Sequence, residues 1–258
     1  MSGSLARSEA RFVAAGVVLL VLTAALSLFV GVSRITPADL WRGDDDAMRV
    51  LLVSRVPRLL ATILAGSALA VAGLIMQGLT RNRFVAPSTA GTIEAAGLGS
   101  LVAIMWFGSQ AVIGRMAIAV VFALAATAVF LVILHRLRFR DALVVPLVGI
   151  MFGGVIRAIA TYVAFKNDLL QTLNTMSAGN FAVVLRGRYE LLWSVGAITV
   201  VAYLVANRIT VAGMGRDMAI NLGVRYERVL LLGLALAASA TAVVVVVVGE
   251  LPFLGLVV

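Results

Sequence analysis

Two arginines, Arg55 and Arg58, stand on either side of Val56 and Pro57, immediately before a long apolar run. A guanidinium group presents parallel N–H donors that match a carboxylate, so this pair has the chemistry to bind acidic side chains of another protein. Because a residue that precedes proline disfavours helical backbone, we expect Val56 to be extended and both arginines to be displayed just outside the following helix. The alternative is that both side chains reach toward lipid headgroups.

A second polar stretch covers residues 208–228 and contains four arginines and two acidic residues. It predicts a short helix in which Met218 and Leu222 share one face and after which Gly223 stops the chain from continuing as a helix. The candidate residues of this stretch are Gly215, Arg216, Asp217, Met218, Leu222 and Gly223. A short amphipathic helix between two apolar runs either lies on the membrane surface or binds a partner protein.

A single charge, Arg157, interrupts an apolar run near its centre. A charge inside a membrane helix is costly, so it faces a cavity or another protein group rather than lipid. Gly149 and Gly153 form a G-x-x-x-G pattern on the same run, which lets another backbone approach closely. These three residues are candidates for a substrate path, where a positive charge suits an anionic cargo. The alternative is an arginine paired with backbone carbonyls or with a neighbouring helix.

Glu94 is the other charged residue that we expect near the membrane interior. It is either an ion-coupling carboxylate or an acid in the first turn of a helix, where the helix dipole favours negative charge. The second interpretation is the simpler one, because the chain turns irregularly through residues 81–91 just before an apolar, glycine-rich run.

The residue types that enzymes use are scarce. The chain has no cysteine and one histidine, and its single lysine, Lys166, is not part of a phosphate-binding loop. No Ser/His/Asp set and no carboxylate pair falls within one apolar run. We therefore expect no enzymatic activity, no metal site and no cofactor bound by this chain.

The composition identifies the solvent of these elements as lipid. Of 258 residues, 62% are hydrophobic and 13% are charged, whereas soluble domains carry about 25% charged residues. The net charge of +9 does not indicate nucleic-acid binding, because the basic residues lie in short clusters between apolar runs. We predict an all-α, polytopic membrane protein.

Seven apolar runs are long enough to cross a bilayer, which takes roughly 20 residues. They are Phe12–Val32, Leu59–Thr80, Ala95–Gly114, Met116–Leu134, Ala142–Phe165, Leu191–Asn207 and Val229–Gly249, and an eighth begins at Leu251. The distribution of arginines favours a cytoplasmic N-terminus, an external segment at residues 33–58 and a cytoplasmic loop at residues 208–228. We expect residues 1–258 to be one transmembrane domain, truncated at its C-terminal end because the chain stops inside an apolar run.

Several motifs together resemble one family of transport proteins. These are Arg55-Val-Pro-Arg58 with the run that follows to Gln77, Asn-Arg-Phe-Val-Ala-Pro and Gly-Thr within 82–92, Met-Gly-Arg-Asp-Met-Ala-Ile-Asn-Leu-Gly-Val at 214–224, and Pro-Phe-Leu-Gly-Leu-Val-Val at 252–258. The chain is similar to the FecCD-type permease subunits of bacterial iron–siderophore and vitamin B12 ATP-binding-cassette importers. Residues 180–190 and 206–215 most resemble the catecholate or petrobactin branch.

This resemblance implies a ten-helix permease of the type II importer class, in the bacterial inner membrane. It implies a second permease subunit, identical or paralogous, with the substrate path between the two. It also implies two cytoplasmic ATPases that use ATP, and an external protein that delivers the ferric siderophore. In this family, arginines matching Arg55 and Arg58 receive carboxylates from the binding protein, the segment matching Gly215–Gly223 enters the ATPase cleft, and the fifth helix lines the path.

Two other functions fit the same residues less well. One is the same scaffold with haem or a corrinoid as cargo. The other is an ion-coupled secondary transporter, which would need titratable groups along its path. Glu94 and Arg157 are the only candidates, and arginine does not release its proton at accessible pH.

Overall fold

The structure is a computed structural model that describes residues 2–31, 36–108, 112–136, 143–184 and 189–257. Within these ranges every regular element is a helix, which agrees with the predicted fold class. The long helices are α1 (Ser2–Phe29), α4 (Val56–Thr80), α5 (Thr92–Phe107), α6 (Val112–Arg136), α7 (Val144–Lys166), α9 (Leu192–Leu204) and α12 (Tyr226–Val248). The short ones are α2 (Pro37–Trp41), α3 (Asp45–Val50), α8 (Leu170–Ser177), α10 (Ala206–Gly213) and α11 (Arg216–Asn221).

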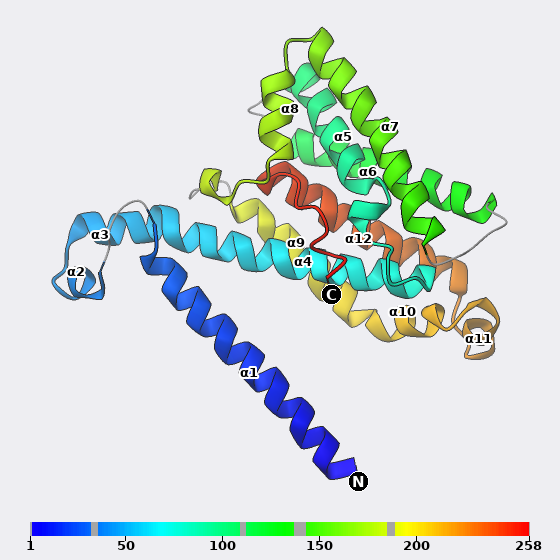
Figure 1. The fold of residues 1–258 in the computed structure, drawn as a ribbon, viewed down its shortest axis with the longest axis horizontal. Coiled ribbons are helices and arrows are strands. Elements are labelled where there is room, and N and C mark those ends of the chain that lie inside the picture. The colour runs from blue at the N-terminus through cyan, green and yellow to red at the C-terminus, as the bar shows by residue number, and fades with distance from the viewer. Residues whose placement is uncertain (1, 32–35, 109–111, 137–142, 185–188, 258) are drawn as a thin grey trace.

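Helices α4 and α12 form the centre of the molecule. They lie side by side and run in opposite directions, while α5 to α8 lie on one side of them and α9 and α10 on the other (Figure 1). Gly233 of α12 makes this contact close, because a Cβ there would lie 2.6 Å from Leu79. Helix α12 is more enclosed than α4, because 67% of its most apolar stretch is buried. A small-residue and valine-rich sequence permits such burial on all sides.

Four helical segments are long and apolar enough to cross a membrane: Asp45–Thr80, Val112–Leu134, Val144–Lys166 and Tyr226–Val248. Helices α9 and α10 would make a fifth span if they are taken as one helix bent by 59°. The apolar helices Val13–Phe29 and Thr92–Phe107 are shorter. Each of the seven predicted runs thus contains an apolar helix, and the number of crossings stays a prediction.

Several predicted boundaries were wrong. The helix predicted at Leu59–Thr80 begins before Leu59, because α3 passes through a π-helical turn (Leu51–Arg55) into α4 without interruption. Val56 is helical, with φ −61° and ψ −48°, and its N–H donates to the carbonyl of Leu51. A π-helical turn widens the helix where Pro57 lacks an N–H and its ring would crowd a normal α-turn. The proline is therefore accommodated inside the helix.

The predicted third and sixth runs also end differently. Helix α5 stops at Phe107, where Gly108 takes a positive φ of 76°, and does not continue to Gly114. The sixth run does not end at Asn207, because α10 continues the helical path to Gly213 after the bend. Most of the first part of the predicted 208–228 loop is therefore helical.

No eighth helix begins at Leu251 among the described residues, since residues 252–256 form turns. This segment crosses α4: a Cβ at Gly73 would overlap the carbonyl oxygen of Gly255, and Gln77 Nε2 donates to the same oxygen at 3.4 Å. Non-helical backbone is tolerated at membrane depth only where protein or a water-filled cavity surrounds it. The close packing on α4 provides that protection.

Helix α1 is attached to the rest of the molecule at one end. It diverges from α4 along most of its length (Figure 1), and the described side chains from Val13 to Leu22 are exposed. In water such a surface would be unstable, so lipid or another protein chain covers it.

Candidate functional sites

The two predicted polar surfaces lie at opposite ends of α4. Helices α2 and α3 precede its N-terminal end, and α11 lies beside its C-terminal end (Figure 1). Since α4 has the length of a membrane span, we expect these two surfaces to face opposite sides of a bilayer. Residues 33–35, which belong to the predicted external segment, lie outside the described residues.

The predicted external segment contains a capped helix, α2. Thr36 Oγ1 accepts from the N–H of Asp39, and the Asp39 carboxylate accepts from the N–H of Thr36 at 2.9 Å. Together with Pro37 at the first helical position, these hydrogen bonds stabilise the start of α2. The hydrogen bonds from Thr36 lower the pKa of Asp39, so this carboxylate is charged at neutral pH. Trp41 at the end of α2 is almost fully exposed.

Arg55 is not displayed on this surface, contrary to the prediction. Its side chain is 6% exposed and its Nη1 donates to the carbonyl oxygen of Val30, just beyond α1. The cause is the helical continuation through Pro57, which turns Arg55 toward the α1 end instead of outward. Arg55 therefore joins α1 to α4.

Arg58 lies one turn further along α4 and is half-buried. Its Nε is buried and has no hydrogen-bond partner among the described residues. A buried guanidinium donor without an acceptor is destabilising, so an acceptor from outside the chain would be favourable at this position. Arg58 therefore lies inside a helix and not just outside one as predicted, and its binding of a partner protein stays a prediction.

The predicted short helix near the other end is present as α11. Gly215 precedes it with φ +115°, and Gly223 follows it with φ +74°, which favours glycine and confirms the predicted stop. Met218 and Leu222 are both more than half exposed, whereas Ala219 is buried against the body of the protein. Helix α11 thus presents an apolar face outward. Asp217 lies in its first turn.

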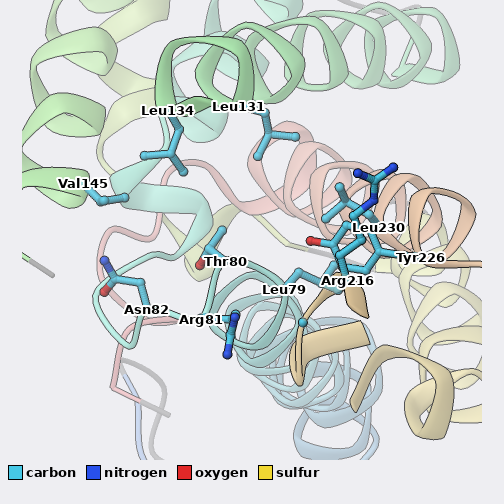
Figure 2. A pocket seen from close by; sticks show the side chains of 11 residues that line it. Leu79, Thr80, Arg81, Asn82, Leu131, Leu134, Val145, Arg216, Tyr226 and Leu230 are labelled. Carbon is cyan, nitrogen blue, oxygen red and sulfur yellow. The ribbon is translucent and has the colours of Figure 1, made fainter. Parts of the chain in front are cut away.

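Two contacts fix α11 to the body. Arg216 Nε lies 3.5 Å from Glu227 Oε1 of α12, and both side chains are about two-thirds exposed. A Cβ on Gly215 would lie 3.1 Å from the guanidinium of Arg81, the residue that ends α4. Between α11 and the ends of α4, α6 and α12 there is a cavity of about 330 Å³. Figure 2 shows its lining, with the Tyr226 hydroxyl pointing toward the end of α4.

The third site surrounds Arg157, near the middle of α7. Its Nη2 forms an ion pair with Glu250 Oε2, and its Nη1 lies 3.4 Å from Ser177 Oγ of α8. Ser177 also donates to Glu250 Oε1 at 3.4 Å. The arginine therefore has the protein partner that was the alternative interpretation, and this partner follows the end of α12 instead of lying within a neighbouring helix.

A cavity of about 240 Å³ adjoins this ion pair. Ser88 and Glu94 also line it, and Ser88 Oγ and Glu94 Oε2 are buried without a hydrogen-bond partner among the described residues. Glu94 lies in the first turn of α5, as the simpler interpretation predicted. Water in the cavity would satisfy these two oxygens.

Gly149 and Gly153 are buried within this chain. A Cβ on Gly149 would overlap the carbonyl oxygen of Thr89, and a Cβ on Gly153 would lie 3.1 Å from the carboxyl carbon of Glu94. The close backbone approach predicted from G-x-x-x-G is therefore present. Its partner is the segment that leads into α5, and of the three path candidates only Arg157 is half exposed.

Sequence reasoning missed Glu250, Ser177 and Arg81. The signal for Glu250 was an isolated acid directly after Gly249 at the end of a valine run. Its partner lies 93 positions away, so spacing alone did not connect the two. Arg81 was noted only as part of an inner turn, and its left-handed φ of 55° places it against Gly215.

Comparisons with known proteins identify the family to which this chain belongs. Residues 19–258 match the FecCD transport family. The petrobactin import system permease protein YclN of Bacillus subtilis is 42% identical over 93% of this chain and 76% of its own length. The ferric-anguibactin transport system permease protein FatD of Vibrio anguillarum is 42% identical over 91% of this chain and 74% of its own.

A solved structure confirms the architecture. It is described as a metal-chelate type ABC transporter in an inward-facing conformation, and its TM-score is 0.76 at 22% identity over 93% of this chain and 77% of that one. At that identity the likeness establishes the fold. Taken with the family match over residues 19–258 and the apolar helices, it leads to one conclusion: this chain is a multi-pass membrane protein that belongs to the FecCD transport family.

Proposed function

We propose that this chain is the permease subunit of an ATP-binding-cassette importer that carries a ferric siderophore, of the catecholate class, across the bacterial cytoplasmic membrane. The relatives named for petrobactin and anguibactin support this cargo. The observation that carries the proposal is that each end of α4 has a group suited to contact with another protein. At one end it is the buried Arg58 Nε, which has no hydrogen-bond partner among the described residues, and at the other it is the exposed apolar face of α11.

In this proposal the α11 end is cytoplasmic and binds the ATPase dimer. Met218 and Leu222 would fit into the ATPase, while Gly215, Arg216, Asp217 and Gly223 set the position of the helix. The N-terminus is then cytoplasmic as well. The chain itself catalyses no reaction and binds no cofactor, because the partner subunits use the ATP.

The α2–α3 end faces the external binding protein. Arg58 is available to donate hydrogen bonds to a carboxylate of that protein, and Arg55 would also donate to it after releasing the carbonyl of Val30. A second permease subunit, identical or paralogous, completes the substrate path.

One pair of variants tests both surfaces. Changing Met218 and Leu222 to aspartate should abolish co-purification of the ATPase, because charge replaces the apolar contact, and should leave binding-protein capture intact. Arg58→Glu should have the opposite pattern. ATP-dependent uptake of a ferric tricatecholate into vesicles should fall in both. Uptake that persists without nucleotide, or ATPase retention by the doubly substituted α11, would contradict the proposal.

A further inference from the structure

The ion pair at Arg157 is unequal in its exposure. The Arg157 side chain is 47% exposed, whereas that of Glu250 is 8% exposed. The second carboxylate near the pair, Glu94, has its Oε2 buried. The guanidinium is therefore the more accessible member of the ion pair, and both carboxylate residues line the cavity beside it.

The surroundings are those of a pathway and not of a closed core. The cavity of about 240 Å³ lies against the non-helical segment that follows α12, with Pro252 and Phe253 among its lining residues. Irregular backbone at membrane depth lines cavities in transporters, and ionisable side chains at that depth mark the routes of substrates. Arg157 lies near the middle of α7, far from either end.

We propose that Arg157 is a contact residue for anionic cargo in this permease, and that Glu250 and Ser177 are positioning residues that hold its guanidinium and moderate its charge. This inference rests on the proposed function for the identity of the cargo, a metal chelate with anionic oxygen donors. Ser177 contacts both members of the pair, so the guanidinium is fixed from α8 and from the segment after α12.

The moderation has a physical purpose. A bare guanidinium in a poorly solvated site would hold an anion tightly, and a transport path needs binding weak enough for release. One carboxylate paired with Arg157 and a second nearby lower the attraction to an anion. Removing a carboxylate should therefore strengthen anion binding, and removing the arginine should weaken it.

These opposite signs distinguish the proposal from a purely structural ion pair. The test is equilibrium dialysis of two probes against the purified chain in zwitterionic detergent: a trianionic ferric tricatecholate and a neutral ferric trihydroxamate. Arg157→Gln should lower affinity for the anionic probe about tenfold, and Glu250→Gln should raise it about threefold. Neither should alter affinity for the neutral probe.

Lys166→Gln is the matched control, because it removes a positive charge from the exposed end of the same helix. It should have no effect at 0.15 M salt, where exposed charges are largely screened. The double variant Arg157→Gln with Glu250→Gln removes both charges of the pair, so no unpaired buried charge remains. It should retain the wild-type melting temperature within a few degrees and show no preference between the probes.

Four results would overturn the proposal: equal affinity of the unaltered chain for both probes, binding of neither, a loss of anion affinity in Glu250→Gln, or an equal loss in Lys166→Gln. The fate of the proposed function is separate. If ATP-dependent uptake holds while charge preference is absent, only this inference fails; if charge preference holds without ATP-dependent uptake, only the proposed function fails.

Discussion

Single glycines determine how closely the backbones in this protein approach one another. Gly73 of α4 lies directly under the segment after α12, where a Cβ would overlap the carbonyl oxygen of Gly255. Gly66 lies two turns earlier on the same helix, and a Cβ there would have no neighbouring atom within 4 Å. The two positions share a helix and a residue type but differ in what surrounds them.

Gly73→Ala should therefore destabilise the protein by about 1–3 kcal/mol, because either α4 or the crossing segment must move. Gly66→Ala should stabilise it by about 0.5–1 kcal/mol, since alanine is the better helix former and has room. Thermal unfolding in detergent, followed by circular dichroism, measures both. Equal effects of the two substitutions would show that the segment does not cross α4 at Gly73.

At the scale of the elements, the weakest attachment is that of α1. Most of its length is exposed. Just beyond its C-terminal end, the Arg55 side chain donates a hydrogen bond to the carbonyl oxygen of Val30. A hydrogen bond from a buried guanidinium is costly to break, because water does not readily replace the lost acceptor there. One residue thus couples the position of α1 to the start of α4.

Arg55→Gln should loosen this junction. The amides in the last turn of α1, including the N–H of Val30 that donates to Leu26, should exchange hydrogen at least tenfold faster, as measured by mass spectrometry. Arg49→Gln in α3 is the control, because Arg49 is exposed and equally basic. Unchanged exchange in Arg55→Gln would mean that another contact holds α1.

Element positions were largely predictable, and the contacts between elements were not. Apolar length located all seven principal helices, because the bilayer imposes that length on each helix separately. The capped start of α2 and the end of α11 were also predictable, since both depend on neighbouring residues. The helical conformation of Val56 was not, because the propensity of a residue before proline was overridden by a π-helical turn.

The candidate sites follow the same division. Met218 and Leu222 were placed correctly on one exposed face, because helical periodicity determines it. The partner of Arg157 could not be found, since Glu250 lies in a segment whose path depends on the packing of α12 and α4. The interior location of Arg55 likewise depends on its contact with the residue after α1. A polar segment separates α1 from Arg55, and the sequence alone does not determine the path of that segment.

At the scale of the whole molecule, the arrangement of its ends makes its orientation measurable. Helices α3 and α11 lie near opposite ends of α4, and the sequence contains no cysteine that would give background labelling (Figure 1). Asp45→Cys and Asn221→Cys, both at exposed positions, therefore report the two sides separately. With the N-terminus in the cytoplasm, a membrane-impermeant maleimide added to intact spheroplasts should label Cys at position 45 at once. The cysteine at position 221 should react only after permeabilisation. The reverse pattern would invert the proposed orientation, and labelling of both from outside would mean that α4 does not cross the bilayer.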